Sequence, residues 1–120
     1  EITPWEEHYV LDLPEKPEDL RFGNSVTRHR IKSGIKKATN QGVEVRHADS
    51  EKDLRAWYEL YLGTMRWHGA MARPYSFFAA MWELLKPRGL FRLILAEQNR
   101  GGTRRLMSGY MLLMGGRTVH

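Results

Sequence analysis

The 120-residue sequence contains no cysteine, and this absence excludes several kinds of chemistry. Without a thiol the chain forms no disulfide, holds no thiolate-bound metal and has no cysteine nucleophile. Long hydrophobic runs are also missing, since the apolar stretch Leu106–Met114 is far too short to cross a bilayer. No signal-peptide pattern opens the chain, so we expect a cytoplasmic protein without a membrane span.

Familiar catalytic and cofactor motifs are missing as well. We find no Walker loop, no glycine-rich dinucleotide fingerprint, no zinc-protease helix motif and no nucleophile elbow. The five histidines share no metal-ligand spacing with one another or with a carboxylate. We therefore expect no metal site and no tightly bound cofactor, and spacing alone assigns no catalytic residue.

What is present is the composition of one globular domain, with 42% hydrophobic and 28% charged residues. The net charge of +5 is unevenly distributed. Residues 1–20 contain seven acids and one lysine, whereas residues 21–37 contain six cations and no acid. Such a basic segment either attracts nucleic acid, a phosphorylated ligand or anionic lipid, or is a solvated face that offsets the acidic N-terminus.

The first forty residues are expected to form a short strand and a helix. Alternation predicts a strand at Tyr9–Leu13, and Asn24 or Ser25 is a candidate N-cap for a helix that ends near Gln41. Gly34 inside this helix indicates either close packing or a break.

The same helix carries a basic stripe, which we define as Arg28, Lys32 and Lys36. These cations recur at i, i+4 and i+8 and therefore share one helix face, separate from the apolar face.

From residue 43 the periodicity predicts strand, helix, helix, strand, strand and the start of another strand. The expected elements are a half-buried strand Val43–His47, a helix from a capping box at Ser50 to His68, a helix from Pro74 to Pro87, strands Phe91–Ala96 and Leu106–Met114 around a turn at 99–102, and a strand opening at Arg117. Phe77, Phe78, Met81, Leu84 and Leu85 are expected to form the buried face of the second helix.

Two sets of residues resemble a known family. Ile35–Ala38 followed by Gly42–Val45 is similar to the I-R-K-A-x-x-x-G-V-x-V passage of the FemAB-like proteins, which belong to the GNAT superfamily of N-acetyltransferases. The second set follows in the family's order and consists of Asp53, Leu54, Tyr58, Tyr61, Thr64, Arg66, Gly69, Pro74, Phe77 and Phe78.

This resemblance implies an α/β (α+β) fold in which helices flank a mixed, mainly antiparallel sheet that is incomplete at its C-terminus. Residues 1–41 would be the tail of a first GNAT-like half with its connecting helix, and residues 42–120 the opening of a second half. The chain begins without Met and ends as a strand opens. We therefore expect a fragment of a longer protein. In the family, the helix after the fourth strand binds the donor's pyrophosphate at its N-terminus, and this sequence ends before that helix. We accordingly expect little or no activity from the fragment alone.

The function implied is that of an acyl- or aminoacyltransferase, with acyl-CoA or aminoacyl-tRNA as donor. The acceptor would be an activated sugar or a peptidoglycan-type precursor of the cell wall or of a polysaccharide. The basic stripe would meet its phosphate or carboxylate groups, and Arg66, Trp67 and His68 would line the acceptor cleft. The alternatives are a solvated helix face for the stripe and, for Arg66, a favourable interaction with the helix dipole.

Two other functions remain open from the residues. The basic helix is a candidate contact for nucleic acid such as a tRNA, which would weaken steeply with salt. The chain is alternatively a non-catalytic interaction domain, and an unpaired edge near Leu106–Met114 predicts self-association.

Overall fold

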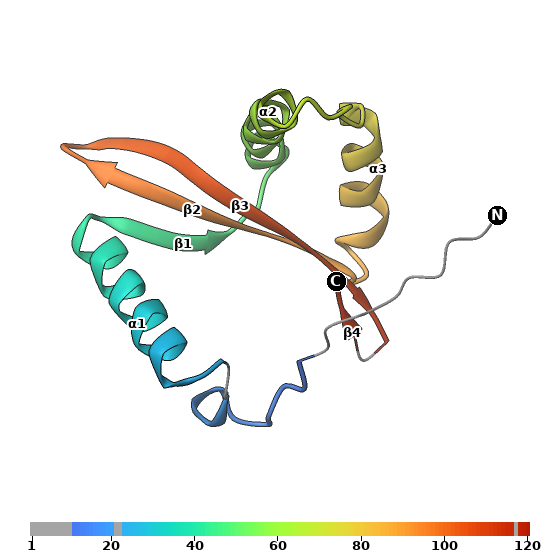
Figure 1. The fold of residues 1–120 in the computed structure, drawn as a ribbon. Helices are drawn as coiled ribbons and strands as arrows, with labels where there is room; N and C mark the ends of the chain where they lie inside the picture. Colours follow the sequence, from blue (N-terminus) through green and yellow to red (C-terminus); the bar gives the residue numbers. More distant parts are fainter. Residues whose placement is uncertain (1–10, 21–22, 117) are drawn as a thin grey trace. The chain divides into compact units, whose positions relative to one another are not determined.

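The computed structural model describes residues 11–20, 23–116 and 118–120 (Figure 1). It divides into two compact units, residues 1–35 and residues 36–120. The first unit contains a short 3-10 helix, Pro17–Asp19, and the beginning of α1 (Ser25–Asn40), which ends in the second unit. In the part of the chain that is described, no helix is both long and apolar enough to cross a membrane. The expected division of a longer protein at residues 41 and 42 stays a prediction.

α1 has the bounds that its capping residues predict. The Asn24 side-chain oxygen accepts a hydrogen bond from the Thr27 N–H at 2.9 Å, which satisfies a free N–H at the helix start. The helix ends before Gly42, whose φ of +76° lies in the left-handed region that favours glycine. The helix continues through Gly34, and a Cβ placed there would meet no atom within 4 Å. The expectation of close packing or a break at Gly34 is therefore wrong.

The strand expected at Tyr9–Leu13 is wrong in its described part. Tyr9 and Val10 lie outside the described residues, and Leu11–Leu13 form no strand. Leu11 and Leu13 are 54% and 70% exposed. A short alternating segment is stable as a strand only when a neighbouring strand takes up its hydrogen bonds, and these residues have no such partner in the described chain.

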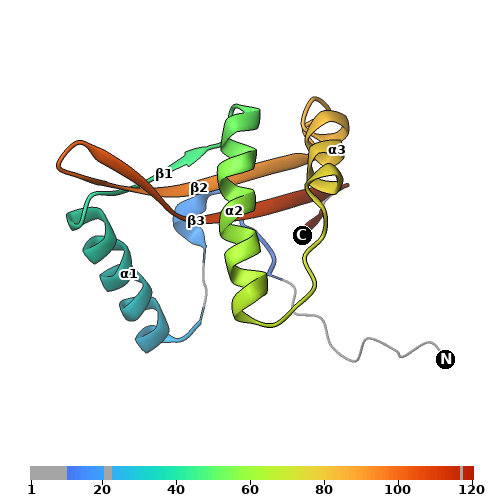
Figure 2. The same cartoon turned by 90° about the horizontal axis from the view of Figure 1, so that it is seen from above.

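The second unit is a four-stranded antiparallel sheet with two helices on one face (Figure 1). Its elements are β1 (Val43–His47), α2 (Glu51–Trp67), α3 (Tyr75–Leu85), β2 (Phe91–Arg100), β3 (Thr103–Gly115) and β4 (Thr118–Val119). The strand order is β1-β2-β3-β4, and Figure 2 shows α2 running across the strands with α3 beside it. The predicted α+β class with a mainly antiparallel sheet is confirmed.

β2 and β3 form a long hairpin around a two-residue turn. Gly101 and Gly102 both have positive φ, +57° and +82°, as the tight turn that matches strand twist requires. The strands consequently extend beyond their predicted limits to Arg100 and Thr103. The register shifts between Ala96 and Glu97, so that Met107 is an extra residue of β3.

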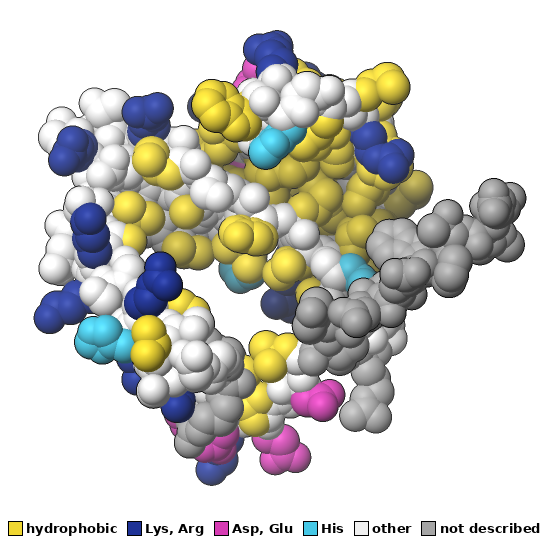
Figure 3. All heavy atoms as spheres, in the orientation of Figure 1, with side chains coloured by type: hydrophobic (Ala, Val, Ile, Leu, Met, Phe, Trp, Pro, Cys, Tyr) yellow, Lys and Arg dark blue, Asp and Glu magenta, His cyan; other side chains and the backbone are white. Residues whose placement is uncertain are grey.

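The hydrophobic core lies between the sheet and the two helices. Phe91, Leu93 and Leu95 alternate along β2 and are at most 2% exposed. They pack with Leu54 and Trp57 of α2 and with Phe78 of α3. Figure 3 shows hydrophobic side chains gathered between α2, α3 and the sheet.

Two side chains expected in the core of α3 lie outside it. Phe77 and Leu84 are 42% and 61% exposed, so their predicted burial is wrong. The face of α3 that meets the core is centred on Phe78 and Met81. Phe77 and Leu84 are seven residues apart, two helical turns, and therefore share the flank of that face.

β3 is much longer than the strand on its outer side. β4 pairs with β3 only at Met114 and Gly115. It confirms the strand expected after the glycine turn, although Arg117 itself lies outside the described residues. No other described strand borders that edge of β3. Open edges favour pairing with another chain, and self-association stays a prediction.

Candidate functional site

Arg46 connects the first strand of the sheet to a helix and to the neighbouring strand. Its guanidinium donates to both carboxylate oxygens of Asp53 on α2, at 2.7 and 2.9 Å. It also donates to both oxygens of Glu97 on β2, at 2.8 and 3.0 Å. Two-point pairs of this kind fix direction as well as distance. We call Arg46, Asp53 and Glu97 the arginine clasp.

The clasp shifts the titration of both of its carboxylates. Hydrogen bonds from the Arg46 guanidinium hold the pKa of Asp53 well below its usual range, against the opposing effect of burial. The same guanidinium lowers the pKa of Glu97. The two side chains are only 13% and 16% exposed, so water screens these interactions less than at an open surface. Both carboxylates are therefore held ionised as structural partners of Arg46.

The alternation of apolar and polar residues along β1 gives no sign of the clasp. It predicts that Val43 and Val45 share the buried face of the strand, whereas Val45 is 69% exposed. Arg46 pairs with Leu95 across the strands and so shares the face that α2 covers. Asp53 also takes part in the N-terminal cap of α2: its N–H donates to Ser50 Oγ at 3.3 Å, and its carboxylate accepts from the Asp49 N–H at 3.0 Å.

The connection between α2 and α3 is held by two tyrosines. Tyr58 Oη donates to the Arg73 carbonyl at 3.0 Å, and the Arg73 N–H donates to Tyr61 Oη at 2.8 Å. The carbonyl and the N–H of Arg73 are thus both hydrogen-bonded by tyrosines on neighbouring turns of α2. The tyrosine rings also pack against Phe78, with centroids 5.8 and 5.0 Å away. The connection therefore has a defined position beside the core.

The predicted acceptor residues lie at the start of this connection. Arg66 is in the last turn of α2, Trp67 ends the helix and His68 caps it. All three side chains are exposed, and Trp67 is 86% exposed. The structure thus brings them together at one end of α2, where Arg66 also lies favourably in the dipole of the helix.

The basic stripe is solvent-accessible along α1. Lys32 and Lys36 are exposed and Arg28 is half-buried. Arg28 and Lys32 belong to the first unit and Lys36 to the second. Both a ligand-binding role and a solvated face agree with this exposure.

No group of three or more His, Asp or Glu side chains in residues 11–20, 23–116 and 118–120 is arranged to hold a metal ion. One open depression of about 370 Å³ adjoins Tyr58. Arg55, Ala56, Tyr58, Glu59 and Tyr75 line it.

The sequence of residues 25–120 matches the family model described as an acetyltransferase (GNAT) domain. The chain belongs to this family. The match begins at the first residue of α1 and includes the whole sheet with both of its covering helices. No curated protein matches the sequence.

Membership of the GNAT family indicates an acyltransferase function and acyl-CoA as the donor. Of the three residues of the arginine clasp, only Asp53 belongs to the sequence motifs of the GNAT domain. No sequence signal paired Arg46 with Glu97, because strand register decides that they meet.

Proposed function

We propose that this GNAT domain belongs to a FemAB-like N-acyltransferase that modifies a cell-wall or polysaccharide precursor. The family match supports acyl transfer, and the ordered FemAB-like motifs from Ile35 to Phe78 support the narrower assignment. The acceptor would be an amine of an activated sugar or peptidoglycan-type precursor, and acyl-CoA would be the donor.

The reaction needs positioning more than it needs a reactive side chain. The acceptor amine attacks the thioester carbonyl, the carbon–sulfur bond breaks, the thiol leaves and the amine gives up a proton. Holding the two substrates in line and polarising the carbonyl account for most of the acceleration in such a direct transfer. Neither a metal nor a covalent intermediate is required.

The observation that carries the proposal is the exposed cationic and aromatic end of α2. Arg66, Trp67 and His68 lie next to the connection that Tyr58 and Tyr61 hold in place. A guanidinium pairs with phosphate or carboxylate, and an exposed indole stacks on a sugar or base. Such a surface suits the anionic and ring-bearing parts of an activated precursor.

The basic stripe on α1 is the second proposed contact. Three cations on one helix face would meet the phosphate or carboxylate groups of an activated precursor. It also favours a second candidate function, in which the donor is an aminoacyl-tRNA and the stripe binds its phosphates. This candidate requires affinity to fall steeply between about 50 and 200 mM salt.

An acyl-transfer assay tests the proposal. Acetyl-CoA is incubated with a nucleotide-linked amino sugar or a peptidoglycan-type precursor, and the acylated product is detected by mass spectrometry. We expect R66Q, W67A and H68Q to raise KM for the acceptor by about tenfold, since each removes a charge-assisted or stacking contact, while KM for acetyl-CoA stays the same.

R100Q is the matched control, because Arg100 is an exposed cation at the far end of the hairpin. It should leave both KM values unchanged. Charge reversal at Arg28, Lys32 and Lys36 tests the stripe separately. Unchanged acceptor affinity in all of these variants contradicts the proposed surfaces, and absence of product with every amine acceptor contradicts the proposed reaction.

A further inference from the structure

The end of α2 and the connection after it carry the two most exposed large hydrophobic side chains of the described chain. Trp67 is 86% exposed, and Met71, four residues later, is 94% exposed. Phe77, in the first turn of α3, is 42% exposed. Single exposed apolar side chains are ordinary, but several around one short connection mark a surface that meets another molecule or a membrane.

The backbone that carries these side chains is held at both ends of the connection. Just after α2, Gly69 has a φ of +61°, and the Ala70 N–H donates to the Met65 carbonyl at 2.9 Å, a pattern that closes a helix C-terminus. Further along, tyrosines of α2 bind both the N–H and the carbonyl of Arg73. A side chain as exposed as that of Met71 therefore protrudes from a defined backbone.

The charge along this part of the chain has one sign. Residues 60–82 contain Arg66 and Arg73 and no aspartate or glutamate. The Arg73 guanidinium lies 4.8 Å from the centroid of the Phe77 ring. Within the described residues, neither arginine side chain has an ion-pair partner. Their N–H donors are available to an external anion.

We propose that this surface, which we define as Arg66, Trp67, Met71, Arg73 and Phe77, docks on a bilayer that contains anionic phospholipid. An indole has an apolar body and a polar N–H, and suits the headgroup level of a bilayer. The guanidinium groups would pair with lipid phosphates, and Met71 would enter the boundary of the acyl chains. Docking of this kind places the chain on the bilayer surface and needs no spanning helix.

A bilayer fits the docking surface better than a folded protein does. Apolar side chains that anchor a protein partner usually cluster in a well-packed centre and fill matching pockets. Trp67 and Met71 instead protrude from a stretch that is flanked by two arginines, and the open depression beside Tyr58 includes neither of them. A fluid bilayer takes up protruding apolar side chains without shape complementarity and surrounds them with phosphates.

The inference goes beyond the proposed acyl transfer. Arg66 and Trp67 also belong to the proposed acceptor surface, whereas Met71, Arg73 and Phe77 do not. Variants at Met71 and Arg73 therefore test docking, and vesicle binding is measured without donor or acceptor. Either proposal can fail without the other.

Sedimentation of the 120-residue chain with lipid vesicles tests the proposal. We expect binding to vesicles of phosphatidylcholine mixed with phosphatidylglycerol, and much weaker binding to vesicles of phosphatidylcholine alone. M71S should weaken binding to the mixed vesicles by about tenfold, because the inserted apolar side chain is lost. R73Q should weaken it by about fivefold, because one cation near the anionic surface is lost. Since Met71 is almost fully exposed, M71S leaves the core of the domain unaltered.

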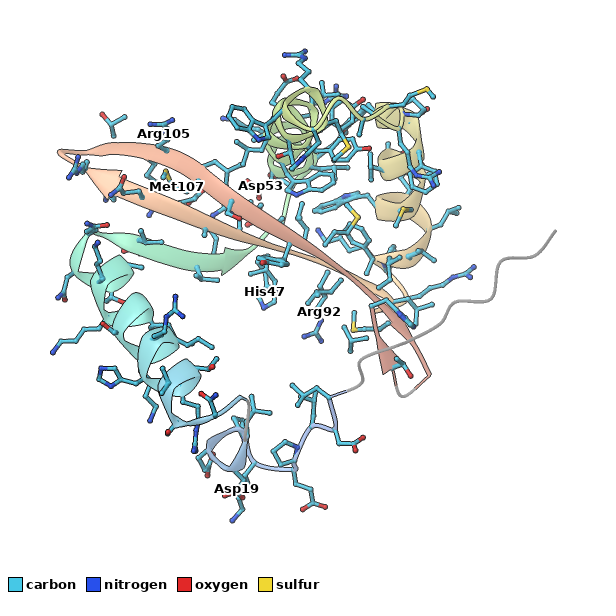
Figure 4. The ribbon with its side chains drawn as sticks, in the orientation of Figure 1. Asp19, His47, Asp53, Arg92, Arg105 and Met107 are labelled. Atoms are coloured by element: carbon cyan, nitrogen blue, oxygen red, sulfur yellow. The ribbon has the colours of Figure 1, made fainter. Side chains whose placement is uncertain are left out.

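M107S and R105Q are the matched controls. Met107 is 47% exposed and Arg105 is also exposed, and both lie on β3 towards the hairpin turn (Figure 4). Each control should bind the mixed vesicles as the unaltered chain does. Binding that M71S leaves unchanged, or that R105Q weakens as much as R73Q, overturns the proposal.

The fluorescence of Trp67 distinguishes a bilayer from an acidic protein as the partner. On addition of mixed vesicles the emission should move to shorter wavelength, because the indole leaves water for the headgroup region, and W67F should show a smaller shift. Polyglutamate, a soluble acidic polymer, should produce no such shift. An equal shift with polyglutamate would assign the surface to an acidic protein and contradict bilayer docking, as would an unchanged spectrum with vesicles.

Discussion

Arg46 Nη2 lies 2.7 Å from Asp53 Oδ1, and its other terminal nitrogen lies 2.9 Å from the second oxygen of the same carboxylate. This pair joins β1 to the first turn of α2, and Glu97 extends it to β2. The strand register of the GNAT domain places an arginine where an apolar side chain would ordinarily face a helix. The orientation of α2, and hence of the proposed acceptor surface at its end, depends on this polar contact as well as on the core.

Replacing the arginine with methionine should destabilise the domain. R46M keeps most of the side-chain volume but leaves Asp53 and Glu97, both largely covered, without their counter-ion. Removing one partner of a covered ion pair leaves uncompensated charge, and partial exposure reduces the penalty. We expect the free energy of unfolding to fall by about 2 kcal/mol in urea at neutral pH.

R105M controls for the loss of a positive charge, since Arg105 is exposed and unpaired in the described chain. It should change stability by less than about 0.5 kcal/mol. Equal effects of R46M and R105M would show that the clasp contributes nothing specific.

Lowering the pH should reduce the free energy of unfolding of the domain, because it protonates Asp53 and Glu97. The pKa values of Asp53 and Glu97 are lower in the folded chain than in the unfolded one. Their contribution to stability is thus complete above the unfolded pKa values of about 4 and is lost as pH falls through the folded values. Urea unfolding between pH 7 and pH 2 should show this decline, and R46M should show a shallower one. Parallel curves for the two proteins would contradict the assignment.

A methyl group at Gly109 should disturb the contact between the sheet and α2. A Cβ there would overlap Trp57 Cδ1 and lie 3.1 Å from Leu95 Cδ2, both part of the core. Overpacking of this kind costs about 1–3 kcal/mol, and we expect G109A to lower the free energy of unfolding by that amount.

Gly115 provides the comparison within the same strand. A Cβ at Gly115 would meet nothing within 4 Å, and its φ is not positive. G115A should therefore leave chemical denaturation almost unchanged. A G109A protein as stable as G115A would mean that Trp57 does not occupy the space beside Gly109.

The sequence predicts those elements whose signals are local. The side-chain cap at Asn24 and the capping residues Ser50 and Asp53 define where α1 and α2 begin. The glycine pair at 101–102 predicts the hairpin, because both residues adopt positive φ. Each of these signals acts within a few residues of its effect, so no knowledge of the tertiary fold is needed.

The features that sequence patterns miss depend on contacts between distant residues. Arg46 is 51 residues from Glu97, and only the register of β1 against β2 brings them together. The alternation of apolar and polar residues assigns the side chains of a strand to two faces, but the helix that packs on the sheet determines which face is buried. In β1, α2 covers the face that carries Arg46 and leaves Val45 exposed.

The hydroxyl of Tyr61 should control the mobility of the connection after α2. Y61F keeps the ring that packs on Phe78 and removes the acceptor of the Arg73 N–H. A hydrogen bond contributes about 1 kcal/mol net, so exchange of the Arg73 amide with solvent should accelerate roughly fivefold. Y75F removes a hydroxyl that donates to Glu51 instead, and should leave the exchange of the Arg73 amide unchanged.

If this connection orders the acceptor surface, Y61F should also raise KM for the acceptor while Y75F does not. Faster exchange without a change in KM would separate the structural role of Tyr61 from the proposed catalytic surface, and unchanged exchange would contradict the role itself.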